Sequence, residues 1–152
     1  KGKPYPPSNL KELQICEGVE ESLKLLKSKG FFLIVVTNQP DASRGKTSID
    51  KIKAINDHLM KLLPLDEINT CFHDNKDNCS CRKPQPGMIL NSAKKRNIDL
   101  SKSYIIGDRK SDIEAGKLAG CKTIFVDYKY EESKPTEYDF EVTSLLMAAM
   151  CI

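Results

Sequence analysis

The chain has 152 residues, 39% of them hydrophobic, which is enough to build the core of one ordinary domain. Its net charge of +3 is mild and its lysines are scattered, so the composition does not imply a nucleic-acid partner and is compatible with a small anionic ligand. No apolar run approaches the roughly 20 residues that cross a bilayer, and the amino terminus lacks the apolar stretch of a signal peptide. We therefore expect a monomeric, cytoplasmic protein without a membrane partner.

The hydrophobic pattern predicts helices alternating with strands. A helix begins at Val19, and Gly30 supplies its stop signal. Residues 31–37 are a continuous apolar, β-branched run, which is typical of a strand buried on both faces of a parallel sheet. An amphipathic helix is predicted from about Ser48 to Leu63, and a short strand from Ile68 to Phe72.

The same alternation continues to the end of the chain. We expect helices at 86–97, 111–120 and 143–150, strands at 103–107 and 122–126, and a long surface connection at 128–140. Repeated helix–strand units predict parallel strands with right-handed crossovers. The expected fold is a single α/β domain, a three-layer doubly wound (Rossmann-like) structure in which 31–37, 103–107 and 122–126 are neighbouring strands of a central parallel sheet.

Polar side chains stand where these strands end, which is where open parallel sheets bind ligands. Thr37, Asn38 and Gln39 follow the first strand and suit phosphate oxygens, although a plain turn would use the same residues. Asp108 follows strand 103–107 in the usual position of a ligand to a hard cation such as Mg²⁺. Lys83 could neutralise phosphoryl charge.

Three segments together carry a family resemblance. The stretches "VVTNQ" (35–39), "CRKPQPGM" (81–88) and "IIGDRKSDIEAG" (105–116), in this order and spacing, resemble the haloacid-dehalogenase (HAD)-type phosphatases. The set is most similar to the small, capless, zinc-containing branch that includes heptose-bisphosphate and histidinol-phosphate phosphatases. The resemblance implies a HAD fold and Mg²⁺-dependent hydrolysis of a phosphomonoester.

The resemblance also implies residue roles. Thr37 would hydrogen-bond the transferring phosphoryl group, Lys83 would stabilise its charge, and Asp108 would bind Mg²⁺. Asp112 would orient the magnesium site from behind, although an acidic residue in a first helical turn also complements the helix dipole. Substrate contacts would come from Asn38, Gln39 and Arg82. Apart from the resemblance, Tyr5 and the loop that contains Arg44 are candidates for contacts to the rest of the substrate. Arg44 would take a second phosphate or a carboxylate, unless it is simply a surface arginine.

The substrate implied first is D-glycero-D-manno-heptose 1,7-bisphosphate, hydrolysed at position 7. Two alternatives stay open: a histidinol-phosphate phosphatase, and a relative without a nucleophile that binds phosphorylated ligands but does not catalyse.

In that branch a cysteine cluster forms a zinc site, and Cys71, His73, Cys79 and Cys81 match its two halves. The chemistry agrees, because four soft or borderline ligands suit the closed tetrahedral shell of structural Zn²⁺. A disulfide between Cys79 and Cys81 would be strained, and reduced, uncoordinated cysteines are the remaining alternative. His58 lies on a helix near its polar boundary and is expected to be solvated.

The chain departs from the family in one respect. HAD-type phosphatases use an Asp-x-Asp pair after an amino-terminal strand, whereas no aspartate precedes Asp41 here. We expect the printed residues to lack that strand, which roughly 15–25 further residues would supply, and to be inactive as given.

Two other classes fit less well. A response-regulator receiver has an Asp, a Thr and a Lys at strand ends but needs a phosphoacceptor Asp in mid-chain and has no use for a zinc loop. A zinc-dependent nucleic-acid module would interleave aromatic and basic residues around the cluster, and only Phe72 and Lys76 flank it.

Overall fold

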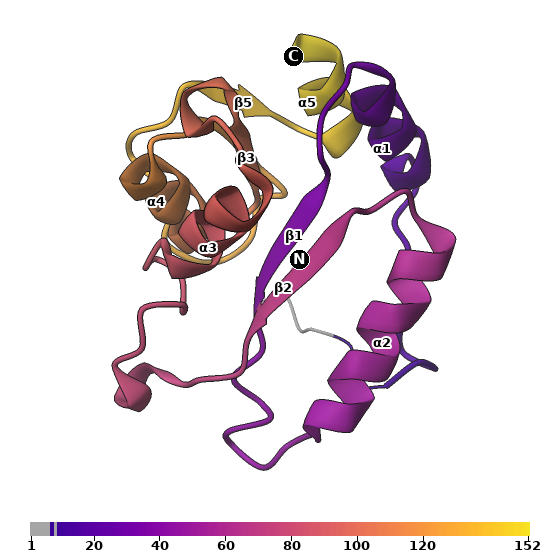
Figure 1. The fold of residues 1–152 in the computed structure, drawn as a ribbon, viewed down its shortest axis with the longest axis vertical. Helices are drawn as coiled ribbons and strands as arrows, with labels where there is room; N and C mark the ends of the chain where they lie inside the picture. The colour runs from indigo at the N-terminus through magenta and orange to yellow at the C-terminus, as the bar shows by residue number, and fades with distance from the viewer. Residues whose placement is uncertain (1–6, 8) are drawn as a thin grey trace. The chain divides into compact units, whose positions relative to one another are not determined.

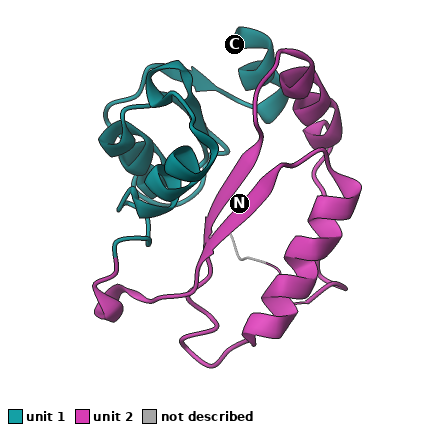
Figure 2. Ribbon diagram, viewed as in Figure 1, with its two compact units in different colours: residues 1–4, 80–152 teal, residues 5–79 magenta. Residues whose placement is uncertain are grey.

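The structure is a computed structural model that describes Pro7 and residues 9–152. Tyr5, a predicted substrate contact, lies outside the described residues. The chain forms two compact units, named as in Figure 2: unit 2 runs up to Cys79, and unit 1 begins at Ser80. Within the described range, no helix combines the length and the apolar composition that crossing a membrane requires.

Unit 2 contains a parallel strand pair and two helices (Figure 1). Its elements are α1 (Val19–Ser28), β1 (Ile34–Asn38), α2 (Ile49–Leu62) and β2 (Glu67–Cys71). α2 is the crossover between the two strands, which pair in parallel with Thr37 opposite Thr70 and Asn38 opposite Cys71. The Ser48 hydroxyl caps α2 by accepting a hydrogen bond from the Lys51 amide. The apolar faces of α1 and α2 supply much of the buried core of this unit: Leu26, Ile52 and Ile55. Leu33, the residue directly before β1, is also buried.

The first strand starts later than its apolar run predicts. Phe31, Phe32 and Leu33 precede β1, and the Phe32 side chain is exposed. The Asp66 carboxylate accepts a hydrogen bond from the Leu33 amide at 2.7 Å and pairs with the Lys27 ammonium group, so this segment bonds to a side chain instead of a neighbouring strand. The expected burial on both faces is also wrong for β1, whose residues are all only partly buried in a two-stranded sheet.

Unit 1 is built on a second parallel sheet. Its main elements are α3 (Gly87–Arg96), β3 (Tyr104–Gly107), α4 (Lys110–Ala119), β4 (Lys122–Val126), β5 (Phe140–Val142) and α5 (Leu145–Cys151). The strand order is β3-β4-β5, and both pairings are parallel. Two short 3₁₀ turns complete the described elements: η1 (Asn75–Asp77) in unit 2 and η2 (Leu100–Lys102) in unit 1.

Helices cover both faces of the β3-β4-β5 sheet. On one face Ile124 and Val126 of β4 pack with Val142 and with Ala148 of α5. On the other, α4 approaches β3 so closely that a Cβ on Gly116 would lie 1.9 Å from the Ile105 side chain. Strand alternation therefore sorts the residues of this sheet between two helical layers, as the three-layer prediction requires.

The predicted neighbours are confirmed for β3 and β4 but not for β1. In the described part of the chain β1 pairs with β2 alone, in a sheet of its own. β5 was missed altogether: it has three residues, two of them exposed, and begins at the last residue of the stretch predicted as a surface connection.

Candidate functional site

The centre of the site in unit 1 is an ion pair between Lys83 and Asp112. The Lys83 Nζ and Asp112 Oδ1 atoms lie 2.5 Å apart, and each side chain is only 11% exposed. The other oxygen of Asp112 accepts a hydrogen bond from the Arg109 amide at 3.2 Å, which caps the first turn of α4. Asp112 therefore caps its helix and, in the same conformation, fixes the position of the Lys83 ammonium group.

Gly107 makes this arrangement sterically possible. It is the last residue of β3, and a Cβ at this position would lie 2.3 Å from the Asp112 Cβ and 2.7 Å from its Oδ2. A side chain at 107 would push the carboxylate away from the strand end. The glycine of the "GD" motif thus serves the packing of the second aspartate.

The loop before α3 presents Lys83. It is closed by a hydrogen bond from the Gly87 amide to the Ser80 carbonyl at 2.9 Å and by one from the Gln85 amide to the Arg82 carbonyl at 2.8 Å. A Cβ on Gly87 would lie 2.2 Å from the Ser80 oxygen, so the closure depends on glycine. Arg82 and Lys83 are consecutive in this closed loop.

Asp108 occupies the carboxyl end of β3, as predicted, and is partly buried. Its Oδ2 accepts a hydrogen bond from the Tyr130 hydroxyl at 2.8 Å, and its Oδ1 accepts none within the described part of the chain. Burial and this hydrogen bond raise the pKa of Tyr130 well above its usual value, so the hydroxyl stays protonated and donates. A carboxylate with one available oxygen is a suitable ligand for a hard cation such as Mg²⁺. Sequence reasoning missed Tyr130, because nothing in its local pattern indicates a partner at the end of another strand.

The predicted phosphate-binding residues of the first strand lie in unit 2. Thr37 is in β1, and the Gln39 side-chain amide donates to its hydroxyl at 3.4 Å. The Gln39 backbone amide donates to the Cys71 carbonyl at 2.7 Å, which extends the pairing with β2 by one residue. Thr37, Asn38 and Gln39 therefore come together at one strand end, while their assembly with Lys83 and Asp108 stays a prediction.

Arg44 has a well-defined acidic partner. Its guanidinium group donates two hydrogen bonds of 2.7 Å to the Asp74 carboxylate, and Asp41 lies 3.9 Å away. The bond to Asp74 raises the pKa of Arg44, which stays charged. The contact joins the loop after β1 to the loop that follows β2.

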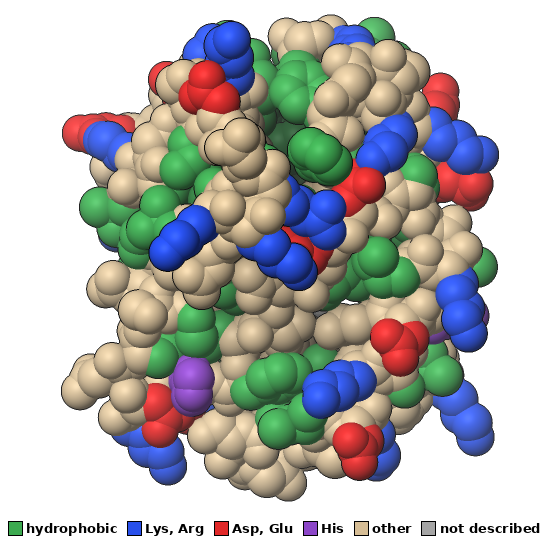
Figure 3. Space-filling view, in the orientation of Figure 1, with side chains coloured by type: hydrophobic (Ala, Val, Ile, Leu, Met, Phe, Trp, Pro, Cys, Tyr) green, Lys and Arg blue, Asp and Glu red, His purple; other side chains and the backbone are tan. Residues whose placement is uncertain are grey.

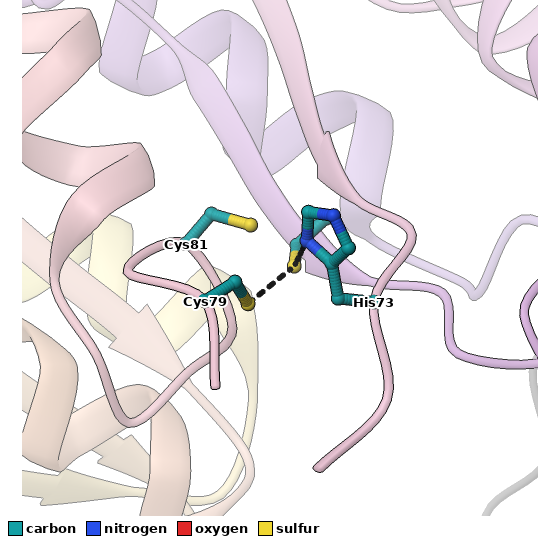
Figure 4. Close-up of side chains that lie close together, drawn as sticks. His73, Cys79 and Cys81 are labelled. Atoms are coloured by element: carbon teal, nitrogen blue, oxygen red, sulfur yellow. Dashed lines mark hydrogen bonds between the residues drawn. The ribbon is translucent and has the colours of Figure 1, made fainter. Parts of the chain in front are cut away.

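The four predicted zinc ligands converge in one continuous segment, 71–81 (Figure 4). Their ligand atoms all lie within 4.8 Å of one another. Cys71 Sγ is 3.6 Å from His73 Nδ1 and 3.7 Å from Cys79 Sγ, and none of the six cysteines, all of which lie in the described residues, forms a disulfide. Two sulfurs on a tetrahedral zinc with bonds of about 2.3 Å would lie about 3.8 Å apart, so the donor set fits this ion.

Local structure holds the segment in shape. Cys71 ends β2 and is buried, which fixes the first ligand to the sheet. Between His73 and Cys79, the chain makes the turn η1, where Asp74 and Asp77 form a capping box and Asn78 takes the left-handed conformation with φ of 47°. His58, by contrast, is exposed on α2, as expected.

Comparison with known proteins defines the family. Residues 80–143 match the HAD-hydrolase-like family model. The D-glycero-beta-D-manno-heptose-1,7-bisphosphate 7-phosphatase of Helicobacter pylori (strain 26695) is 36% identical over 121 residues, covering 76% of this chain and 70% of that protein. The enzyme of the same name from Haemophilus ducreyi is 36% identical over 124 residues, covering 74% and 68%. The chain belongs to the HAD-like phosphatases.

A solved structure supports membership of the HAD-like phosphatases and confirms the fold. The D,D-heptose 1,7-bisphosphate phosphatase of B. bronchiseptica, determined with magnesium and phosphate, matches with a TM-score of 0.83 at 26% identity. The match covers 95% of this chain and 86% of that one. The predicted α/β HAD fold and phosphatase family are thus confirmed.

Proposed function

We propose that this protein is a Mg²⁺-dependent phosphatase that removes the 7-phosphate of D-glycero-D-manno-heptose 1,7-bisphosphate. The observation that carries the proposal is the end of β3, where Asp108 offers a carboxylate oxygen and Asp112 holds Lys83 at 2.5 Å. Relatives that are 36% identical to this chain over 121 and 124 aligned residues bear the name of that activity. Histidinol phosphate is the second candidate substrate.

The proposed roles follow from the chemistry of each side chain. Thr37 donates a hydrogen bond to a phosphoryl oxygen, and the Lys83 ammonium group neutralises charge on the phosphoryl group during transfer. Asp108 holds Mg²⁺, which supplies further charge neutralisation when it is bound. Asp112 keeps Lys83 in place. The proposed substrate contacts are Asn38, Gln39, Arg82 and Arg44, the last of which would have to share its guanidinium group with Asp74.

We also propose that the working enzyme includes an Asp-x-Asp strand that the printed residues lack. Within the described residues β1 and β3 are each edge strands, with β2 beside one and β4 beside the other. An edge strand in a HAD sheet accepts a further parallel partner. Such a strand would supply the aspartate nucleophile and the general acid that the phosphoryl transfer needs.

A phosphate-release assay tests both proposals. Two forms of the protein, residues 1–152 and a form with the Asp-x-Asp strand, are given Mg²⁺ with the α and β anomers of the heptose bisphosphate or with histidinol phosphate. We expect turnover only in the longer form, with a preference for a heptose bisphosphate, and a loss on the order of 100-fold in Lys83→Ala. Turnover by residues 1–152 would contradict the nucleophile argument, and an inactive longer form would favour a protein that only binds phosphorylated ligands.

We propose, finally, that Cys71, His73, Cys79 and Cys81 hold a structural Zn²⁺. The segment 71–81 buries little apolar surface of its own beyond Cys71, so metal ligation would be its main source of order. Metal analysis of freshly purified protein should find one zinc per chain, and Cys79→Ser should release it. Cys16→Ser, which changes an exposed cysteine outside the cluster, is the matched control and should keep its zinc.

A further inference from the structure

The segment 127–139, which we call the strap, joins β4 to β5 and is held at both ends. At its start, the buried Asp127 carboxylate accepts hydrogen bonds from the Lys129 and Lys134 ammonium groups at 2.6 and 2.9 Å. At its end, the Asp139 carboxylate accepts a hydrogen bond of 2.7 Å from the Thr123 amide, and the Asp139 amide donates to the Thr123 hydroxyl. The strap therefore starts and finishes against β4.

Between these anchors, the strap contacts the end of β3 twice. The Tyr130 hydroxyl donates to Asp108 Oδ2 at 2.8 Å, and Glu132 pairs with the Arg109 guanidinium group at 3.2 Å. The Tyr130 ring lies 5.8 Å from the Tyr128 ring, centroid to centroid. Two consecutive residues of the "GDR" sequence are thus each held by a strap residue.

Charge explains why the strap can stay in this position. Asp127 is buried, so its charge requires partners, and both lysines that neutralise it come from the strap itself. Lys129 takes a left-handed backbone conformation with φ of 60°, and its amide donates to the same carboxylate at 2.8 Å. This turn directs the following residues, Tyr130 included, back toward the end of β3. Figure 3 shows basic and acidic side chains next to one another on the face in view.

We infer that Tyr130 is a positioning residue for the magnesium ligand. By holding Oδ2 of Asp108, it sets the rotation of the carboxylate and leaves Oδ1 as the oxygen available to the cation. A ligating carboxylate usually has such a hydrogen-bonding partner, and loss of the partner typically weakens metal binding about 10–100-fold. The inference rests on the proposed function, in which Asp108 is the magnesium ligand. It extends that function by giving Tyr130 a role beside this ligand.

The test compares two tyrosine hydroxyls of the strap. Tyr130→Phe removes the donor to Asp108 and keeps the ring. Tyr138→Phe is the matched control, because Tyr138 donates to the exposed carboxylate of Glu141 and its ring packs on Phe125 in both forms. Binding of Mn²⁺, as a probe for Mg²⁺, is measured by electron paramagnetic resonance on the longer form of the protein, with circular dichroism to verify folding.

We expect Tyr130→Phe to weaken Mn²⁺ binding about tenfold and Tyr138→Phe to change it less than twofold. In an Asp108→Asn background, where the carboxylate is already gone, Tyr130→Phe should have no further effect on Mn²⁺ binding. Equal Mn²⁺ affinity in Tyr130→Phe and the unaltered protein would overturn the inference, as would equal losses in the two phenylalanine variants.

Activity gives a second, separate measurement. Tyr130→Phe should raise the Mg²⁺ concentration for half-maximal activity by about tenfold while kcat at saturating Mg²⁺ stays within about threefold, because added metal restores occupancy. A fall in kcat that saturating Mg²⁺ does not rescue would contradict a positioning role. If no phosphorylated substrate is hydrolysed but Mn²⁺ binding changes as described, the proposed function fails and the role of Tyr130 toward the metal stands.

Discussion

Lys83→Met tests the ion pair at the centre of the site. The substitution keeps the length and much of the apolar stem of the side chain but removes the ammonium group 2.5 Å from Asp112. The Asp112 side chain would then be about nine-tenths buried and would keep the hydrogen bond of 3.2 Å from the Arg109 amide. An aspartate left without its cation in such a place lowers the stability of the folded state.

The size of the effect follows from burial. Removing one partner of a buried ion pair costs about 3–5 kcal/mol, and the residual 11% exposure and the amide hydrogen bond place this pair at the lower end, about 3 kcal/mol. For a chain of this length that corresponds to a fall in melting temperature of about 6–12 °C. Lys24→Met is the matched control, because Lys24 pairs with Glu20 at 2.9 Å with both side chains more than half exposed, and should cost less than about 1 kcal/mol.

The assay is urea-induced unfolding, followed by circular dichroism because the chain has no tryptophan. Adding Asp112→Asn to Lys83→Met removes the unpaired negative charge of the carboxylate. The double variant should therefore lose less unfolding free energy than the sum of the two single losses, by about 1 kcal/mol or more. A loss in Lys83→Met no larger than in Lys24→Met, or strict additivity in the double variant, would refute the reasoning.

Two further predictions concern glycine and charge in unit 1. Gly107→Ala should destabilise the protein by about 1–3 kcal/mol in the same urea assay, because the new Cβ would lie 2.3 Å from the Asp112 Cβ. Unchanged stability would contradict this close packing of Gly107 against Asp112. Hydrogen bonds from Lys129 and Lys134 hold the pKa of Asp127 well below its usual range, so its stabilising effect is present above about pH 4 and is lost as pH falls further. The difference in melting temperature between the unaltered protein and Asp127→Asn should therefore be largest near neutral pH and shrink in acid, and a difference independent of pH would count against this pairing.

The local sequence pattern predicted the elements that have clear start and stop signals. β4 has the predicted bounds, 122–126, because it is a short apolar, β-branched run that is buried along four of its five residues. α4 ends beside Gly120, which has the φ of 90° that favours glycine after a helix. The pattern failed where a side chain distant in sequence competes for the backbone. Asp66 accepts the hydrogen bond from the Leu33 amide, and β1 begins at Ile34 instead of the predicted residue 31.

The candidate site shows the same division. The zinc ligands were predicted because soft ligands at short spacing are rare by accident, and the structure brings their atoms within 4.8 Å of one another. Tyr130 could not be predicted, since its role depends on how far the strap returns after Asp127. A tyrosine in a charged connection carries no local signal of a partner 22 residues earlier in the chain.

Asp112 shows why naming a residue from the sequence does not establish which contacts it makes. The sequence allowed two interpretations: an acid that complements the dipole at a helix start and, by the family resemblance, a residue that orients the magnesium site. In the structure one oxygen accepts from the Arg109 amide at the start of α4 and the other binds Lys83, while the orienting of a magnesium site by Asp112 stays a prediction. Both contacts require the close approach that Gly107 allows at the end of β3. The spacing of Gly107, Asp108 and Asp112 is therefore a steric condition for placing Lys83, and changing the glycine should disturb the lysine without touching it.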